Sequence, residues 1–132
     1  MPRAAVTGSS GKLGRAVVDH LHDSGWDVVA LDQAAPARDG ITSTRVDLTD
    51  FGQTYEALAG IDDRHDGVDA VVHLAAIPAP GLRPNAATFH NNMTATYNVS
   101  HPAPDVLARG GERLLHGGPA ILEVRPAFIV NG

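Results

Sequence analysis

Short apolar runs alternate with amphipathic stretches over most of the chain. Runs rich in apolar and β-branched residues predict strands at 4–7, 28–32, 41–46 and 68–74, the third being the weakest. Apolar residues at helical spacing predict helices that begin in the loop 8–14 and at Asp50, and a further helix over 86–99. This alternation is typical of βαβ units. We therefore predict an α/β protein with a Rossmann-type, doubly wound parallel sheet in three α/β/α layers.

The pattern changes after Val99. Two prolines at 102 and 104 and glycine pairs at 110–111 and 117–118 interrupt any regular element. Between and after them, 113–116 and 121–130 are candidates for a fifth and a sixth strand. We divide the chain into a Rossmann portion at 1–99 and an irregular tail at 100–132.

Composition excludes several classes of partner. The chain has 132 residues, a net charge of −5 and no cluster of lysine or arginine, so neither nucleic acid nor an anionic membrane surface is expected as a partner. It has no cysteine, and its histidines show no metal-ligand spacing, so we expect no metal site. No apolar run is long enough for a membrane span and no signal peptide is evident. We expect a soluble, cytoplasmic protein.

The segment 7–14 (TGSSGKLG) follows a predicted strand and opens a predicted helix. Glycines in this context permit a tight turn and a close approach of backbone amides to a pyrophosphate. A P-loop does not fit, because Leu13 follows Lys12 and Val6 stands where its first glycine should be. A glycine-rich turn without a ligand remains the alternative. The predicted cofactor-binding residues of this loop are Gly8, Ser10, Gly11, Lys12, Leu13 and Gly14.

Asp32 ends the second predicted strand, eighteen positions beyond Gly14. A carboxylate at this place accepts hydrogen bonds from the adenosine ribose and repels a 2′-phosphate, which favours NAD over NADP. Arg38 lies nearby in the sequence and would soften that discrimination. The alternative is an aspartate that only caps the turn after the strand.

Four motifs in order make the chain resemble the NAD-dependent epimerase/dehydratase family of extended short-chain dehydrogenases/reductases. They are 7–14, 47–50 (DLTD), 73–76 (HLAA) and 92–99 (NMTATYNV). Segments 77–81 and 88–92 look most like bacterial members that act on sugars, uronate-dehydrogenase-like ones included. The resemblance implies NAD as the cofactor and hydride transfer at a sugar or nucleotide-sugar carbon.

The resemblance also implies a role for six further residues. Asp47 and Leu48 would meet the adenine, and Leu74, Ala75 and Ala76 would line the crevice beside the nicotinamide ribose. Asn92 would tie the following helix to the fourth strand, a structural rather than a catalytic role. A helix-entry role for Asp47 and close helix packing at 75–76 are the alternatives.

The chain departs from the family where the chemistry is done. Family members use a Tyr-x-x-x-Lys pair and a serine or threonine after the fifth strand. Lys12 is the only lysine of this chain, and no serine or threonine follows Ser100. We therefore predict no catalytic residue, a missing substrate domain and a truncated family member. A non-catalytic NAD-binding module or sensor, a non-functional product and a homo-oligomer all stay open.

Overall fold

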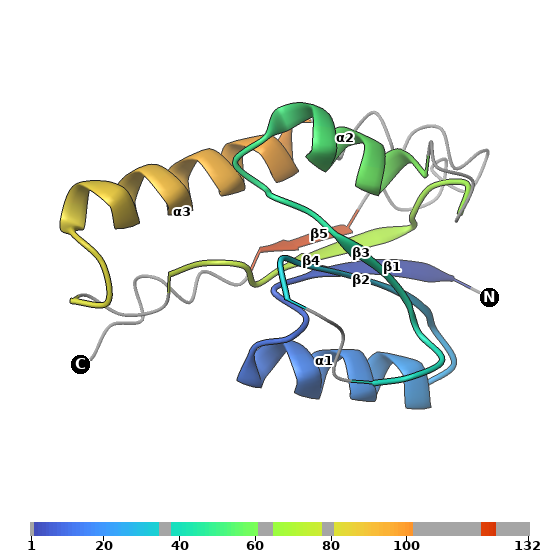
Figure 1. Ribbon diagram of the computed structural model, residues 1–132. Helices are drawn as coiled ribbons and strands as arrows, with labels where there is room; N and C mark the ends of the chain where they lie inside the picture. Colours follow the sequence, from blue (N-terminus) through green and yellow to red (C-terminus); the bar gives the residue numbers. More distant parts are fainter. Residues whose placement is uncertain (1, 35–37, 61–64, 78–80, 102–119, 124–132) are drawn as a thin grey trace.

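The computed structural model describes residues 2–34, 38–60, 65–77, 81–101 and 120–123 of the chain (Figure 1). The predicted elements are present there, with ends that differ by a residue or two. In chain order they are β1 (Arg3–Thr7), α1 (Lys12–Asp23), β2 (Asp27–Asp32), β3 (Thr42–Arg45), α2 (Phe51–Ala59), β4 (Ala70–His73), α3 (Asn85–Ser100) and β5 (Ala120–Glu123).

The five strands form one sheet in the order β3-β2-β1-β4-β5, and every pairing is parallel. Helix α1 covers one face of this sheet, whereas α2 and α3 cover the other (Figure 1). The chain therefore has the predicted Rossmann-type architecture of three α/β/α layers. Strand order reverses between β1 and β4, the place where open α/β sheets form a crevice at the carboxyl ends of their strands.

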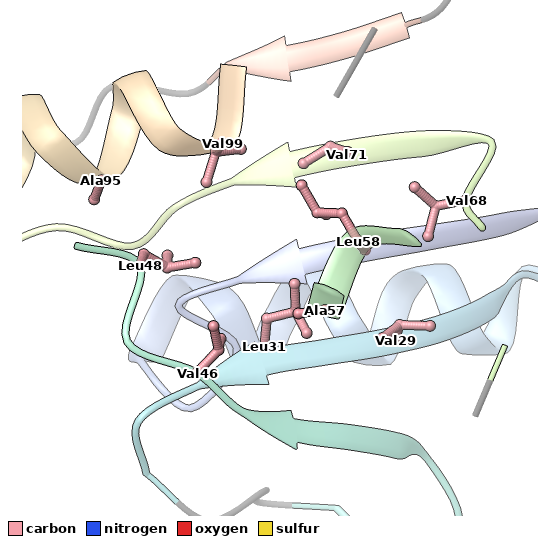
Figure 2. Packing of buried hydrophobic residues seen from close by; sticks show 11 residues of the cluster. Val29, Leu31, Val46, Leu48, Ala57, Leu58, Val68, Val71, Ala95 and Val99 are labelled. Carbon is pink, nitrogen blue, oxygen red and sulfur yellow. The ribbon is translucent and has the colours of Figure 1, made fainter. Parts of the chain in front are cut away.

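Both faces of the sheet are buried at β1, β2 and β4, and successive residues of a strand point to opposite faces. On the side of α2 and α3, Ala5 packs in a cluster with Leu58 and Val99, among others (Figure 2). On the side of α1, its neighbour Val6 packs in a second cluster with Val18. Burial on both faces explains why the strands read as continuous apolar runs rather than as alternating ones.

Strand β5 contains the first residues of the predicted strand at 121–130. It pairs directly with β4, in register Ala70 with Ala120. This place beside β4 is the one expected for 113–116, the predicted fifth strand. Residues 113–116 and 124–130 lie outside the described residues. The first described strand after α3 is therefore the fifth strand of the sheet.

Helix α3 buries a different face from the one its apolar residues suggest. Phe89, Met93 and Tyr97, four residues apart, are 65%, 49% and 56% exposed. The buried residues are Ala95, Asn98 and Val99. The side of α3 that faces the sheet thus combines apolar Ala95 and Val99 with Asn98, whose Nδ2 donates to the Leu48 carbonyl at 2.8 Å.

Arg3 joins three segments at the amino-terminal edge of the sheet. Its Nε donates to Asp27 Oδ2 at 2.7 Å, and its Nη1 donates to Asp66 and to the Gly67 carbonyl. Its backbone amide donates to Asp69 Oδ2 at 2.8 Å. The starts of β1 and β2 and the approach to β4 are thereby fixed at the end of the sheet opposite the crevice.

Candidate cofactor-binding site

A cleft of about 700 Å³ opens at the carboxyl ends of the central strands. It brings together residues from the glycine loop, the ends of β2 and β4, and the turn after β3. Eleven of the thirteen predicted residues line it, namely Gly8, Gly11, Lys12, Leu13, Gly14, Asp32, Asp47, Leu48, Leu74, Ala75 and Ala76. The other two, Ser10 and Asn92, lie behind this lining.

The glycine loop fits tightly between β4 and α1. Gly8 has a left-handed backbone (φ 68°), and a Cβ there would lie 2.8 Å from the amide nitrogen of Ala75. A Cβ at Gly14 would lie 1.9 Å from the Gly8 carbonyl oxygen. Side chains at either position would separate the loop from its neighbours, so these glycines are needed for packing whatever the cleft holds.

Helix α1 begins at Lys12, directly on the cleft, with Gly11 as its N-cap. The first amides of a helix have no carbonyl partner within it, and glycine offers no side chain to cap them. The positive end of the helix dipole points the same way. Leu13, one of the apolar residues in the predicted helical pattern, is 49% exposed and faces this cleft instead of the core.

Asp32 connects the end of β2 to the glycine loop. Its Oδ2 accepts a hydrogen bond from the Ser10 amide at 2.9 Å, and its Oδ1 accepts one from the Ala34 amide at 3.1 Å. The turn-capping role is therefore present. An ionised carboxylate has about four acceptor sites, so these two bonds leave room for hydroxyl donors from a ligand.

Asp47 organises the turn between β3 and α2. Its Oδ1 accepts from the Thr49 hydroxyl at 2.6 Å and from the Thr49 amide at 3.0 Å. These bonds, the hydroxyl one first, hold the pKa of Asp47 below its ordinary value, with a smaller contribution from Gln33. Asp50 caps α2 as predicted, accepting from the Gln53 amide at 3.0 Å. Asp47 is thus an ionised acceptor at the rim of the cleft.

A buried hydrogen-bond network holds the cleft-lining backbone after β4. The Thr7 hydroxyl oxygen accepts from the amides of Leu74 (3.0 Å) and Ala75 (3.2 Å). With both lone pairs used, its hydrogen is donated to His73 Nδ1 at 2.7 Å. His73 Nε2 then carries the ring hydrogen and donates to the Thr96 hydroxyl at 3.1 Å. Sequence reasoning placed His73 only within a motif and missed this positioning role.

Asn92 ties α3 to the chain after β4, the role that the resemblance implies. Its Oδ1 accepts from the Ile77 amide at 2.8 Å, and its Nδ2 donates to the Ile77 carbonyl at 3.2 Å. Both backbone groups of one residue are satisfied by a single amide side chain. Ile77 itself lines the cleft, so Asn92 supports the site from behind.

Sequence reasoning missed part of the cleft lining. Arg83 comes from the turn before α3 and Asn91 from within α3, and no local motif marks either position. Gln33 and Thr49 stand next to predicted residues, and adjacency was the available signal for them. Among the residues that the structure describes, the unpredicted lining residues are Leu31, Gln33, Val46, Thr49, Ile77, Arg83, Asn91 and Ala95.

In the part of the chain that the structure describes, no cluster of three or more histidine and acidic side chains has the arrangement of a metal site. Within the same residues, no helix combines the length and the apolar character that crossing a bilayer requires.

Comparisons with known proteins agree with this geometry. An L-arabinose 1-dehydrogenase (NAD(P)(+)) of Haloferax volcanii is 36% identical over 103 residues, which are 78% of this chain and 36% of the relative. A short-chain dehydrogenase/reductase superfamily protein of Agrobacterium tumefaciens, solved with bound NAD, has a TM-score of 0.65 at 28% identity and covers 80% of this chain and 30% of its own. Uronate dehydrogenase of the same species has a TM-score of 0.67 at 25% identity, and the match covers 94% of this chain and 40% of the relative.

The fold and the cleft define a Rossmann-type protein of the short-chain dehydrogenase/reductase kind. The model of the NAD dependent epimerase/dehydratase family matches residues 4–119, and the chain belongs to that family. The match covers between 30% and 40% of the length of the three relatives named above.

Proposed function

We propose that this chain binds NAD in the cleft at the carboxyl ends of β1, β2 and β4. The observation that carries the proposal is the junction of the glycine loop, the start of α1 and Asp32 in one cleft. Amides of the loop and of the first helical turn hold the pyrophosphate. Asp32 accepts hydrogen bonds from the adenosine ribose, and its negative charge disfavours a 2′-phosphate.

One end of the cleft binds the adenine and the other end binds the nicotinamide ribose. Asp47 and Leu48 contact the adenine, because a carboxylate accepts from its exocyclic amine and the neighbouring backbone reaches a ring nitrogen. Leu74, Ala75 and Ala76 lie beside the nicotinamide ribose, where small side chains keep the crevice open. The volume of about 700 Å³ lies within the range of roughly 300–1,000 Å³ of small-molecule and cofactor sites. A solved relative with bound NAD supports the same assignment.

In this proposal the chain, as it stands, retains the cofactor site and lacks the catalytic one. The family reaction is hydride transfer at a sugar or nucleotide-sugar carbon. A tyrosine exchanges a proton with the substrate, and a lysine assists this proton transfer. Lys12, the single lysine, lies in the glycine loop, and no Tyr-x-x-x-Lys pair occurs in the sequence. Residues 1–99 then act as the cofactor-binding portion and 100–132 as a tail without catalytic groups, in a protein that we place in the cytoplasm.

Calorimetric titration with NAD tests the binding proposal. We expect saturable binding by the unsubstituted protein and a loss of about tenfold or more in affinity for Asp32→Asn, because a hydrogen bond to a charged group contributes about 1.5–3 kcal/mol. Asp39→Asn is the matched control, since it removes an exposed carboxylate of the neighbouring turn and should leave the affinity unchanged. Absence of NAD binding by folded protein would refute the proposal.

Turnover tests the catalytic part separately. NADH formation is followed after mixing the protein with NAD and a panel of sugars, sugar acids and nucleotide sugars. We expect no NADH above the background of the Asp32→Asn variant. Sustained NADH formation would show that another group replaces the tyrosine and lysine, and it would leave the proposed NAD site in place.

A further inference from the structure

A second, smaller cavity of about 130 Å³ lies on the other side of the glycine loop. It is formed between α1, β2 and the chain that leads into β3. Its lining residues are Ser9, Arg15, Val18, Asp19, Ala30, Arg38 and Ile41. Ser9 precedes Ser10, whose amide donates to Asp32, so this cavity adjoins the ribose end of the main cleft. Its volume suits a single phosphate group and is too small for a nucleoside.

Two arginines flank the small cavity, and they are held differently. Arg15 donates through Nε to the Ser10 carbonyl at 3.0 Å. Arg38 donates through Nη1 to Asp19 Oδ1 at 2.8 Å and through Nη2 to Asp23 Oδ1 at 3.4 Å. Both carboxylates belong to α1, one turn apart, so one guanidinium bridges two successive turns of the helix. The hydrogen bond that Arg38 donates to Asp19 is the main cause that raises the pKa of Arg38 above its ordinary value.

The side chains around this cavity do not form a positively charged site for a 2′-phosphate. The positive charges of Arg15 and Arg38 are balanced by Asp19 and Asp23, and Asp32 at the end of β2 adds one negative charge. A phosphate monoester brings about −1.5 to −2 further charges at neutral pH. A free guanidinium at this place would bind the 2′-phosphate of NADP, because its fork of donors matches phosphate oxygens. Here two of its five donors are directed at Asp19 and Asp23 of α1.

We propose that Asp19 and Asp23 determine the preference for NAD over NADP by holding Arg38 against α1 and away from the 2′-position of the adenosine. This inference rests on the proposed NAD site and adds to it a pair of positioning residues outside the cleft. Asp19 and Asp23 contact neither end of the dinucleotide and act through Arg38. Because ion pairs at exposed positions are weak, substitution of the two aspartates releases Arg38 without unfolding the chain.

The test measures the NADP and NAD affinities of each variant by calorimetry in low-salt buffer. The D19N/D23N variant is expected to bind NADP about tenfold more tightly than the unsubstituted protein, because the released Arg38 guanidinium pairs with the 2′-phosphate. Its NAD affinity should change by less than about twofold, since the main cleft is untouched. The gain should shrink at high salt, as interactions between exposed charges do.

Two further variants separate release of Arg38 from a general change in net charge. In D19N/D23N/R38A the gain for NADP should disappear, because the guanidinium is gone. E56Q removes one exposed carboxylate on α2, across the sheet, and should leave the ratio of the two affinities unchanged. Thermal unfolding of every variant confirms that the compared proteins are folded.

The outcomes distinguish the two proposals. If the unsubstituted protein binds NAD but D19N/D23N gains no affinity for NADP, the inference is overturned and the NAD site stands. A gain that persists in the R38A background also overturns it, because the aspartates then act by repulsion alone. If the folded protein binds neither dinucleotide, the proposed function fails and the inference fails with it.

Discussion

Substitution of Gly14 by alanine tests the packing on which the cleft depends. Gly14 lies in the first turn of α1, where the helix passes over the start of the glycine loop. A Cβ at this position would lie 1.9 Å from the Gly8 carbonyl oxygen and 2.9 Å from Ser9 Cα. Both contacts are to backbone, so no flexible side chain can move aside.

The magnitude follows from the size of this overlap. Ordinary contact begins at 3.4 Å, so the loop and the helix must separate by about 1.5 Å. Overpacking of a well-packed site costs about 1–3 kcal/mol, and this overlap belongs at the upper end. Alanine recovers up to about 1 kcal/mol through its better helix propensity. We expect Gly14→Ala to lower the free energy of unfolding by about 2 kcal/mol, which lowers Tm by roughly 6 °C.

Gly52→Ala is the matched control, because it places the same residue in the first turn of another helix. There the nearest atom to the new Cβ is Asp50 Oδ1, at 3.4 Å, so helix propensity dominates and stability should rise by up to about 1 kcal/mol. Urea unfolding followed by circular dichroism measures both variants, and NAD titration of Gly14→Ala should show at least about a tenfold loss of affinity. A Gly14→Ala protein as stable as Gly52→Ala would refute the reasoning.

Two more predictions concern the hydrogen bonds behind the cleft. Thr7→Val keeps the shape of the side chain but leaves the buried amides of Leu74 and Ala75 without their hydroxyl acceptor, so urea unfolding should show a loss of about 3 kcal/mol, against about 1 kcal/mol or less for Thr7→Ser. The pKa of Asp47 lies below its ordinary 3.8, so its contribution to stability is complete above that pH and is lost as the pH falls through the folded value. Asp47→Asn should therefore flatten the decline of Tm below about pH 4, and an unchanged acid profile would contradict this role.

The elements of the fold were predictable from sequence wherever the signal was local. The glycine loop, the apolar run of β1 and the cap at Asp50 each lie within a few residues of the element that they define. The orientation of α3 was not predictable in this way. Phe89, Met93 and Tyr97 set its apolar period, yet the sheet takes the opposite side. That side buries Ala95 and Val99 and pairs Asn98 with the Leu48 carbonyl, a contact that no local pattern specifies.

The candidate site shows the same division. Glycines and Asp32 carry a spacing that predicts their place in the cleft. Arg83 and Asn91 carry none, because only the packing of α3 beside β4 brings them to its edge. The hydrogen bond from the Ser10 amide to Asp32 crosses 22 residues, and no pattern in either segment specifies it. Sequence identifies the chemistry of such groups, whereas tertiary packing decides which of them meet.

The central position of β1 has a consequence for how the chain is made. β1 pairs with β2 on one side and with β4 on the other, and four of its five residues are buried. A ribosome produces β1 before either neighbour, and its second partner is complete only once His73 has emerged. Until then one edge of an apolar strand stays open, which is a template for pairing with other nascent chains. Slower synthesis or a chaperone that shields β1 should therefore raise the yield of native protein.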